Sequence, residues 1–109
     1  MKGKFEIYKD KAGEFRFRLK ASNGQNIFAS QGYKKKSGCI NGIESVKKNA
    51  QIENRFQKIE TKAGKFAFNL TAANQQIIGT SQQYNSSSSR DKGIKSVMKN
   101  APEADIFEV

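Results

Sequence analysis

The sequence predicts an α+β fold, with one domain made of two tandem, pseudosymmetric halves. The first observation is a duplication: residues 5–50 recur as residues 56–101 at a constant offset of 51, with about half of the aligned positions identical. The second is a change of apolar spacing within each copy, from the alternation of strands to the stripe of a helix. We therefore expect a single domain, residues 1–109, built of repeats of about 1–51 and 52–109.

The chain begins with a predicted hairpin. Phe5 and Ile7 alternate with polar side chains over residues 4–9, which predicts a strand with one covered face. Residues 10–13 have the composition of a turn, in which Gly13 is free to take a positive φ. The next strand has a core-facing row and a solvent-facing row: Phe15, Phe17, Leu19 and Ala21 against Glu14, Arg16, Arg18 and Lys20.

A second turn follows in each copy. Asn23-Gly24 predicts a two-residue type I′ turn, because both of its central positions need a positive φ. The second copy has Asn74-Gln75 at this place, a weaker version that we expect to cost some stability. A short third strand is expected over residues 27–30.

The apolar spacing then becomes that of a helix, from about Ser37 to Asn49. Its apolar stripe consists of Ile40, Ile43 and Val46. We expect Ser37 and Ser88 to cap the two helices. Pro102 is expected to stop the second helix from continuing.

Each helix is followed by a predicted strand, over residues 52–60 and 104–109. Phe5, Phe56 and Phe107 are equally spaced, so the C-terminal strand looks like the start of an unfinished third unit. Such a strand would cover a sheet edge that is otherwise open to aggregation.

The segments GEFRFRLKASNG (residues 13–24) and GIESVKKNA (residues 42–50), each matched again one repeat later, resemble the YegP-like proteins, a family of small uncharacterised proteins. The resemblance covers nearly the whole chain and corresponds to the duplicated form of the family. It implies two tandem β3-α-β repeats that form one antiparallel sheet with two helices on one face. It also implies that the repeats exchange their terminal strands across a pseudo-twofold axis. It implies no activity.

Positive charge is concentrated in the first copy. The chain has 20 Lys and Arg against 10 Asp and Glu, and residues 1–51 hold 12 of the basic and only 4 of the acidic side chains. A basic surface attracts polyanions, so we consider a nucleic-acid site on this copy. Its candidate residues are Arg16, Arg18, Lys20, Lys34, Lys35, Lys36, Lys47 and Lys48. The alternative is a solvated face that maintains solubility.

Some polar residues are kept in both copies and form a second candidate site. These residues are Tyr33, Tyr84, Lys48, Lys99, Asn49 and Asn100. They could line a pocket that is repeated across the pseudo-twofold axis. The alternative is structural: the tyrosine ring packs over the start of the helix, and Ser45 bonds back to a helical carbonyl.

Catalytic and cofactor signatures are not found. The sequence has no His, no acidic residue occurs at equivalent positions of both copies, and Cys39 is the only cysteine. We therefore expect no catalytic residue, metal or cofactor, although Cys39 could be reactive beside a helix start. A lone thiol fits a reducing compartment, and no apolar run approaches the length of a membrane span, so a cytoplasmic location is expected.

These observations favour an uncharacterised, basic, non-enzymatic binding or structural module whose ligand is unknown. The alternative is nonspecific nucleic-acid binding through the basic face of the first repeat, and a small enzyme is third. The partner is unknown and could be nucleic acid or an acidic protein, with no membrane involved. We expect a monomer with pseudo-dimeric internal symmetry.

Overall fold

The computed structural model describes residues 3–109 and contains two α-helices and seven strands in one sheet. The first repeat supplies β1 (Lys4–Lys9), β2 (Phe15–Lys20), β3 (Asn26–Ser30) and α1 (Lys36–Asn49). After a 3-10 turn, η1 (Glu53–Arg55), the second repeat supplies β4 (Phe56–Glu60), β5 (Phe66–Thr71), β6 (Ile77–Thr80) and α2 (Ser87–Asn100). The last strand is β7 (Asp105–Glu108).

The strand order is β4-β5-β6-β3-β2-β1-β7, so each repeat forms half of the sheet and β3 pairs with β6 at the centre. The two halves keep the same register, since Ile7 is opposite Phe17 in one half and Lys58 is opposite Phe68 in the other. Within the described chain the strand pairs are antiparallel, as predicted, except that β7 runs parallel to β1.

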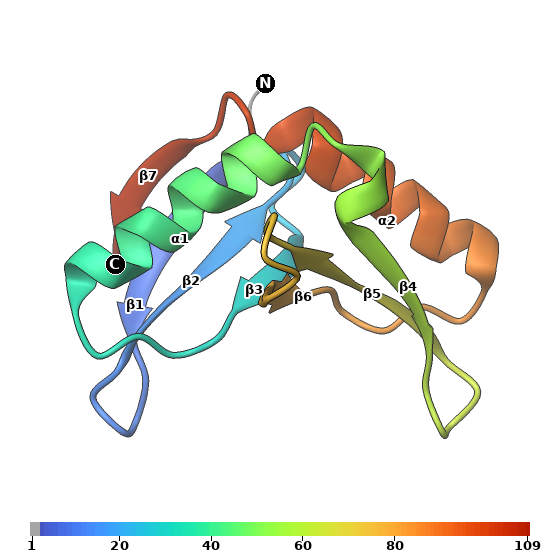
Figure 1. The fold of residues 1–109 in the computed structure, drawn as a ribbon, viewed down its shortest axis with the longest axis horizontal. Helices are drawn as coiled ribbons and strands as arrows, with labels where there is room; N and C mark the ends of the chain where they lie inside the picture. Colours follow the sequence, from blue (N-terminus) through green and yellow to red (C-terminus); the bar gives the residue numbers. More distant parts are fainter. Residues whose placement is uncertain (1–2) are drawn as a thin grey trace.

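The parallel pair follows from where each helix delivers the chain. The strand after α1 crosses to the other half of the sheet and pairs with β5 as β4. The strand after α2 crosses back, but the equivalent place beside β2 is occupied by β1, so β7 adds outside β1 in the same direction. Figure 1 shows that β7 and β4 lie at opposite ends of the sheet.

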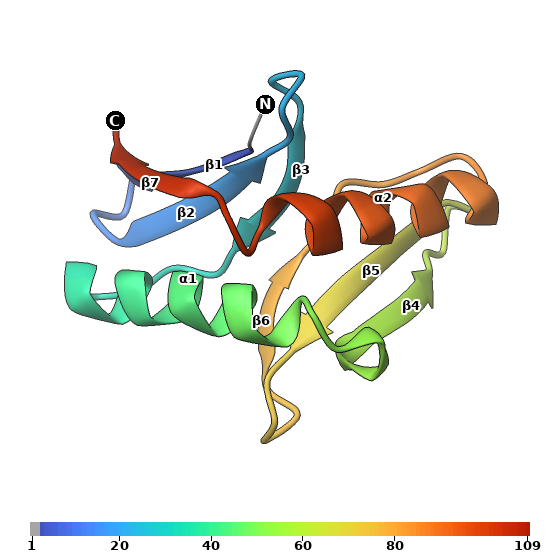
Figure 2. The ribbon, with the colours of Figure 1, turned by 90° about the horizontal axis from the view of Figure 1, so that it is seen from above.

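Both helices lie over the same side of the sheet (Figures 1 and 2), and the side chains beneath them form one core cluster with members from both repeats. The aromatic pairs repeat: Phe5 meets Phe17 edge to face at 5.7 Å, and Phe56 meets Phe68 at 5.6 Å. The predicted phase of these strands is therefore correct. Neither helix has the length of apolar sequence that a membrane crossing needs, within residues 3–109.

Symmetry breaks at the centre of the core. Phe28 stacks on Phe68 with ring centroids 6.4 Å apart. The residue equivalent to Phe28 is Gly79, and a Cβ at Gly79 would lie 2.6 Å from the Phe28 ring. One ring thus fills space near the pseudo-twofold axis that two rings would have to share.

The turns differ in part from the prediction. Gly13 has φ of +80°, as expected, but the turn at Asn23-Gly24 is not type I′, because among the described residues only Gly24 of this pair has a positive φ. Ala21 accepts from the Gly24 N–H, and its own N–H donates to Gln25, which makes a three-residue loop. Gln75 adopts the same conformation with φ of +69°.

The predicted helix caps are also wrong. Ser37 lies inside α1, and the residue before this helix, Lys35, makes no side-chain capping bond. Ser88 lies inside α2, and its predicted role belongs to Ser86, whose Oγ accepts from the backbone N–H of Ser89 at 3.1 Å. Each serine from residue 86 to 89 could serve as the N-cap, and the helix begins two residues earlier than a cap at Ser88 would allow.

Candidate binding groove

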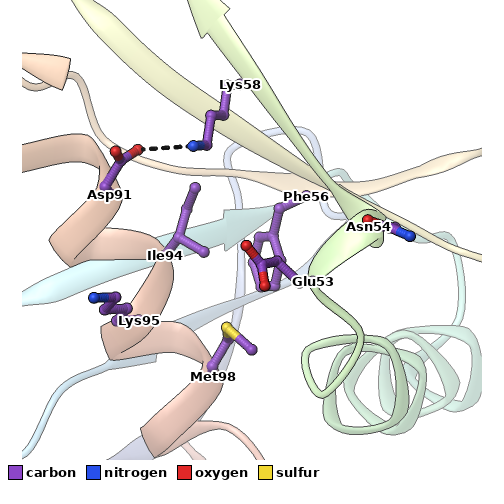
Figure 3. Close-up of a pocket in the computed structure, with 8 residues that line it drawn as sticks. All are labelled: Glu53, Asn54, Phe56, Lys58, Asp91, Ile94, Lys95 and Met98. Atoms are coloured by element: carbon purple, nitrogen blue, oxygen red, sulfur yellow. Dashed lines mark ion pairs between the residues drawn. The ribbon is translucent and has the colours of Figure 1, made fainter. Parts of the chain in front are cut away.

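A groove of about 620 Å³ lies between the edge strand β4 and helix α2. Figure 3 shows its lining side chains. Its apolar lining consists of Phe56, Ile94 and Met98, and its polar lining consists of Glu53, Asn54, Lys58, Asp91 and Lys95. The groove therefore combines an apolar floor with charges of both signs, beside the unpaired edge of a strand.

The equivalent surface of the first repeat is covered by β7. There β7 pairs with β1 from Lys4 to Ile7, and Ile106 lies beside Phe5 in this register. The N–H of Val109 extends the ladder by donating to the Ile7 carbonyl at 2.9 Å. The β4–α2 groove is thus the open counterpart of a site that the chain fills with its own last strand.

Among the lining positions of the groove, two are apolar in the first repeat and charged in the second. The first repeat has Ile7, which lies beside Glu108 of β7, and Ile40, which packs against the core. The second repeat has Lys58 and Asp91 at these positions, whose Nζ and Oδ1 are 3.3 Å apart. Partial desolvation acts to raise the pKa of Asp91, but hydrogen bonds from Lys58 and Arg90 outweigh it and hold this pKa below its ordinary value. An exposed ion pair replaces an apolar contact, as a surface left open to water requires.

The predicted basic row lies on the sheet face opposite the helices, and acidic partners neutralise much of it. Glu6 lies between Arg18 at 2.7 Å and Lys20 at 3.3 Å, and Asp10 lies 2.7 Å from Arg16. The hydrogen bond from Arg18, with that from Lys20, holds the pKa of Glu6 below its ordinary value despite its burial. The row is therefore a network of ion pairs rather than three unpaired cations.

The remaining basic candidates lie elsewhere. Lys34, Lys35 and Lys36 are exposed around the start of α1, and Lys36 pairs with Glu108 of β7. Lys47 and Lys48 lie in the last turn of α1, about 16 Å further along its axis. The structure thus divides the eight candidates among the open sheet face and the two ends of a helix on the other face.

The repeated polar residues are also divided. The ring of Tyr33 stacks on Phe17 at 6.3 Å, and its hydroxyl reaches the place that a Cβ of Gly42 would occupy. Asn49, about 10 Å further along α1, is buried and donates to the Ser45 carbonyl at 2.8 Å. These residues therefore do not meet in one pocket.

The second repeat has the same arrangement. Tyr84 lies against Gly93, and Asn100 donates to the Ser96 carbonyl at 2.8 Å. The lysines Lys48 and Lys99 are exposed. Lys99 and Asn100 also line a smaller hollow of about 290 Å³, formed with the turn at Ser22 of the first repeat.

Cys39 is fully buried, and burial raises the pKa of its thiol. A raised pKa keeps the sulfur protonated at neutral pH, which removes the physical basis for a reactive thiolate. Within residues 3–109, no group of three His, Cys, Asp or Glu side chains is placed to hold a metal ion.

The groove between β4 and α2 is not among the sites predicted from the sequence. Its signal was present in the alignment of the two copies, where Ile7 and Ile40 become Lys58 and Asp91. A pair of apolar positions that changes to opposite charges indicates a surface that is covered in one copy and open in the other.

Comparison with known proteins finds two matches to one family model, described as a domain of unknown function (DUF1508), over residues 10–57 and 61–108. Each match runs from a hairpin turn through the helix into the strand beyond it, so it spans the crossing of the chain between the sheet halves.

Similar proteins span nearly the whole chain. A UPF0339 protein in the ptx operon 5′ region of Stutzerimonas stutzeri is 63% identical over 109 residues, which are 100% of this chain and 98% of that protein. The UPF0339 protein YegP of Escherichia coli K12 is 48% identical over 92% of this chain and 91% of its own length. The solution NMR structure of a UPF0339 protein from Shewanella oneidensis matches with a TM-score of 0.93 at 51% identity, covering 99% of this chain and 92% of that one.

Proposed function

The chain belongs to the DUF1508 family, and we propose that it is a non-enzymatic binding module whose ligand lies in the groove between β4 and α2. We place this module in the cytoplasm as a monomer. The protein would act by holding a partner, since the described residues supply no metal cluster and its one thiol is buried and protonated.

The single observation that carries this proposal is the contrast between the two equivalent grooves. The groove of the first repeat holds β7, which demonstrates that this surface geometry accepts an extended chain. The groove of the second repeat keeps the apolar residues Phe56, Ile94 and Met98 without a covering strand. Apolar side chains beside an unpaired strand edge are characteristic of binding surfaces.

Nucleic-acid binding through the basic face has weaker support. Arg16, Arg18 and Lys20 are engaged by Asp10 and Glu6, so a phosphate would have to compete with carboxylates that are already in place. Base-stacking sheets also present aromatic rings on the open face. Tyr8 is on this face, but Arg18 covers its ring at 4.6 Å.

The test is affinity capture from an extract of a bacterium that encodes a member of the family, with immobilised protein and three variants. Met98→Trp fills the groove, and Lys47→Trp places the same side chain at the equivalent position of the first repeat. The third, neutralised variant changes Arg16, Arg18, Lys20 and Glu6 to Gln and Asp10 to Asn, so that neither Glu6 nor Asp10 is left as a charged carboxylate without its cations.

We expect a ligand that is retained by the wild type, by Lys47→Trp and by the neutralised variant, and that is lost with Met98→Trp. Equal recovery on all four proteins, or no recovery on any, would overturn the proposal. Recovery of nucleic acid that disappears with the neutralised variant and in raised salt would establish the alternative in its place.

A further inference from the structure

We propose that β4 accepts an extended segment of a partner protein as an eighth strand, parallel to β4, with an apolar side chain in the groove and an acidic side chain beside Lys58. The proposal deepens the proposed function and rests on it, because it names the class of ligand for the same groove. Its chemical class is a peptide with an apolar residue followed two positions later by Asp or Glu.

The template for this segment is β7 on β1. In that pair Ile106 lies beside Phe5 and Glu108 lies beside Ile7. The offset between repeats places Phe56 and Lys58 at the positions of Phe5 and Ile7. Because β1 on β2 and β4 on β5 share one register, β4 presents its outer edge as β1 does.

The apolar side chain of the added strand would lie in the groove. A side chain at the position of Ile106 would lie beside Phe56 on the helix side of the sheet, where Ile94 and Met98 of α2 line the groove. Backbone hydrogen bonds would supply affinity, and this one pocket would supply selectivity.

The charges favour an acidic residue at the next step. In the first repeat Glu108 pairs with Lys36 at the start of α1, and the equivalent of Lys36 is Ser87. The second repeat thus has no lysine at this helix position, but it has one on the strand, where Lys58 stands in place of Ile7. Each groove therefore places one lysine near the position of Glu108, from a different element. In the second groove this lysine is also 3.3 Å from Asp91, so the acidic residue of the partner would share Lys58 with that exposed carboxylate.

The occupant is a segment of another protein. The chain's own β7 is held on β1, at the far end of the sheet from β4. The last strand of a second copy is held in the same way by its own β1.

The probe is a synthetic peptide with the sequence of residues 103–109, Glu-Ala-Asp-Ile-Phe-Glu-Val, titrated into the full-length protein and followed by amide chemical shifts. We expect saturable shifts confined to β4 and α2, with β1 and α1 unchanged because their groove is filled. A peptide carrying Ile106→Asp should not bind.

Charge exchange tests the acidic step. The peptide with Glu108→Lys should bind the wild type about threefold more weakly, as should the unchanged peptide with Lys58→Glu protein, since an exposed ion pair contributes little. Lys58→Glu protein with the Glu108→Lys peptide should recover the affinity. The amide spectrum of free Lys58→Glu protein checks that the fold is intact.

No shifts at β4, shifts that do not depend on the isoleucine, or a charge exchange without recovery would each overturn the proposal. So would concentration-dependent dimerisation that shifts β4 without any peptide, because it would assign the edge to a second copy. If the extract yields a ligand that Met98→Trp loses while the peptide fails to bind, the groove remains the site and only the peptide class is rejected.

Discussion

The two halves of the sheet share a core but differ at their outer edges. In the first half β7 covers the edge of β1, and this half has the apolar residues Ile7 and Ile40. In the second half β4 is the last strand, and the equivalent residues form the ion pair of Lys58 with Asp91. The comparison teaches that identity between the repeats marks what holds the fold, whereas a change of chemistry marks what each half meets.

The open faces differ in the same way. The first half carries Arg18 and Lys20 beside the buried Glu6 and Arg16 beside Asp10, and the second carries the neutral Ala67, Asn69 and Thr71. This change is internally compensated, since the half with the cations also holds the acidic residues that pair with them. The excess charge of the first repeat is thus partly a structural network.

The shared part of the comparison is tested most strongly in the core. Phe17→Ala and Phe68→Ala should each lower the free energy of unfolding by about 3–5 kcal/mol. Both side chains are fully buried, so each substitution leaves a cavity the size of the lost ring. Urea denaturation measures both losses. A midpoint that stays unchanged in either variant would contradict the equivalence of the two half-cores.

The central asymmetry is tested by Gly79→Ala. The new Cβ would lie 2.5 Å from the Ala29 carbonyl oxygen and 2.6 Å from the Phe28 ring, so we expect a loss of about 1–3 kcal/mol. The matched control is Gly64→Ala, whose Cβ has open space and whose cost comes only from its positive φ. Two results together would disprove crowding at residue 79. Gly79→Ala and Gly64→Ala would lose the same free energy of unfolding, and a smaller side chain at residue 28 would not restore the stability of Gly79→Ala.

The ion-pair network should be specific to the first half. Glu6→Gln should cost about 1–3 kcal/mol, because it removes charge-assisted hydrogen bonds to a side chain that is only 7% exposed. Gln57→Glu, at the equivalent position of the second half, should change the stability far less, since Asn69 and Thr71 stand there in place of Arg18 and Lys20.

The same network predicts a pH dependence. The folded pKa of Glu6 lies below its ordinary value of 4.5, so its contribution to stability is complete above that value and is lost as the pH falls through the folded pKa. The fall of the urea midpoint in acid should be shallower in Glu6→Gln than in the wild type. Parallel acid curves for the two proteins would exclude Glu6 as a source of the dependence.

The duplication made the fold predictable, but the parallel pairing of β7 with β1 was not predicted. Alternation at Phe15, Phe17 and Leu19 fixes which strand face is buried, because a strand has a period of two. The parallel placement of β7 depends on β1 already occupying the place beside β2, which no local pattern records.

The candidate site was less predictable for a related reason. A count of lysines and arginines does not say which of them have acidic neighbours, and Glu6 meets its partners only through the pairing of β1 with β2. Tyr33 and Asn49, which occur in both copies, serve the fold: Tyr33 packs against Gly42, and Asn49 donates a hydrogen bond to the Ser45 carbonyl. The groove itself needed the order of strands at the sheet edge, because an open edge is defined by what does not pair with it.

The smallest expected effect concerns the turns that join the second and third strand of each half. Gly24 and Gln75 are equivalent and both have a positive φ, a conformation that costs little for Gly and is unfavourable for a residue with a Cβ. Gln75→Gly should therefore stabilise the protein by about 0.5–1 kcal/mol, and Gly24→Gln should destabilise it by a similar amount. The double variant, which exchanges the two residues, should return the urea midpoint to that of the wild type, since the turns lie in different halves and share no contact partner in their backbone hydrogen bonds. Stabilisation by Gly24→Gln would show that the two turns, despite their shared φ, are held by different forces.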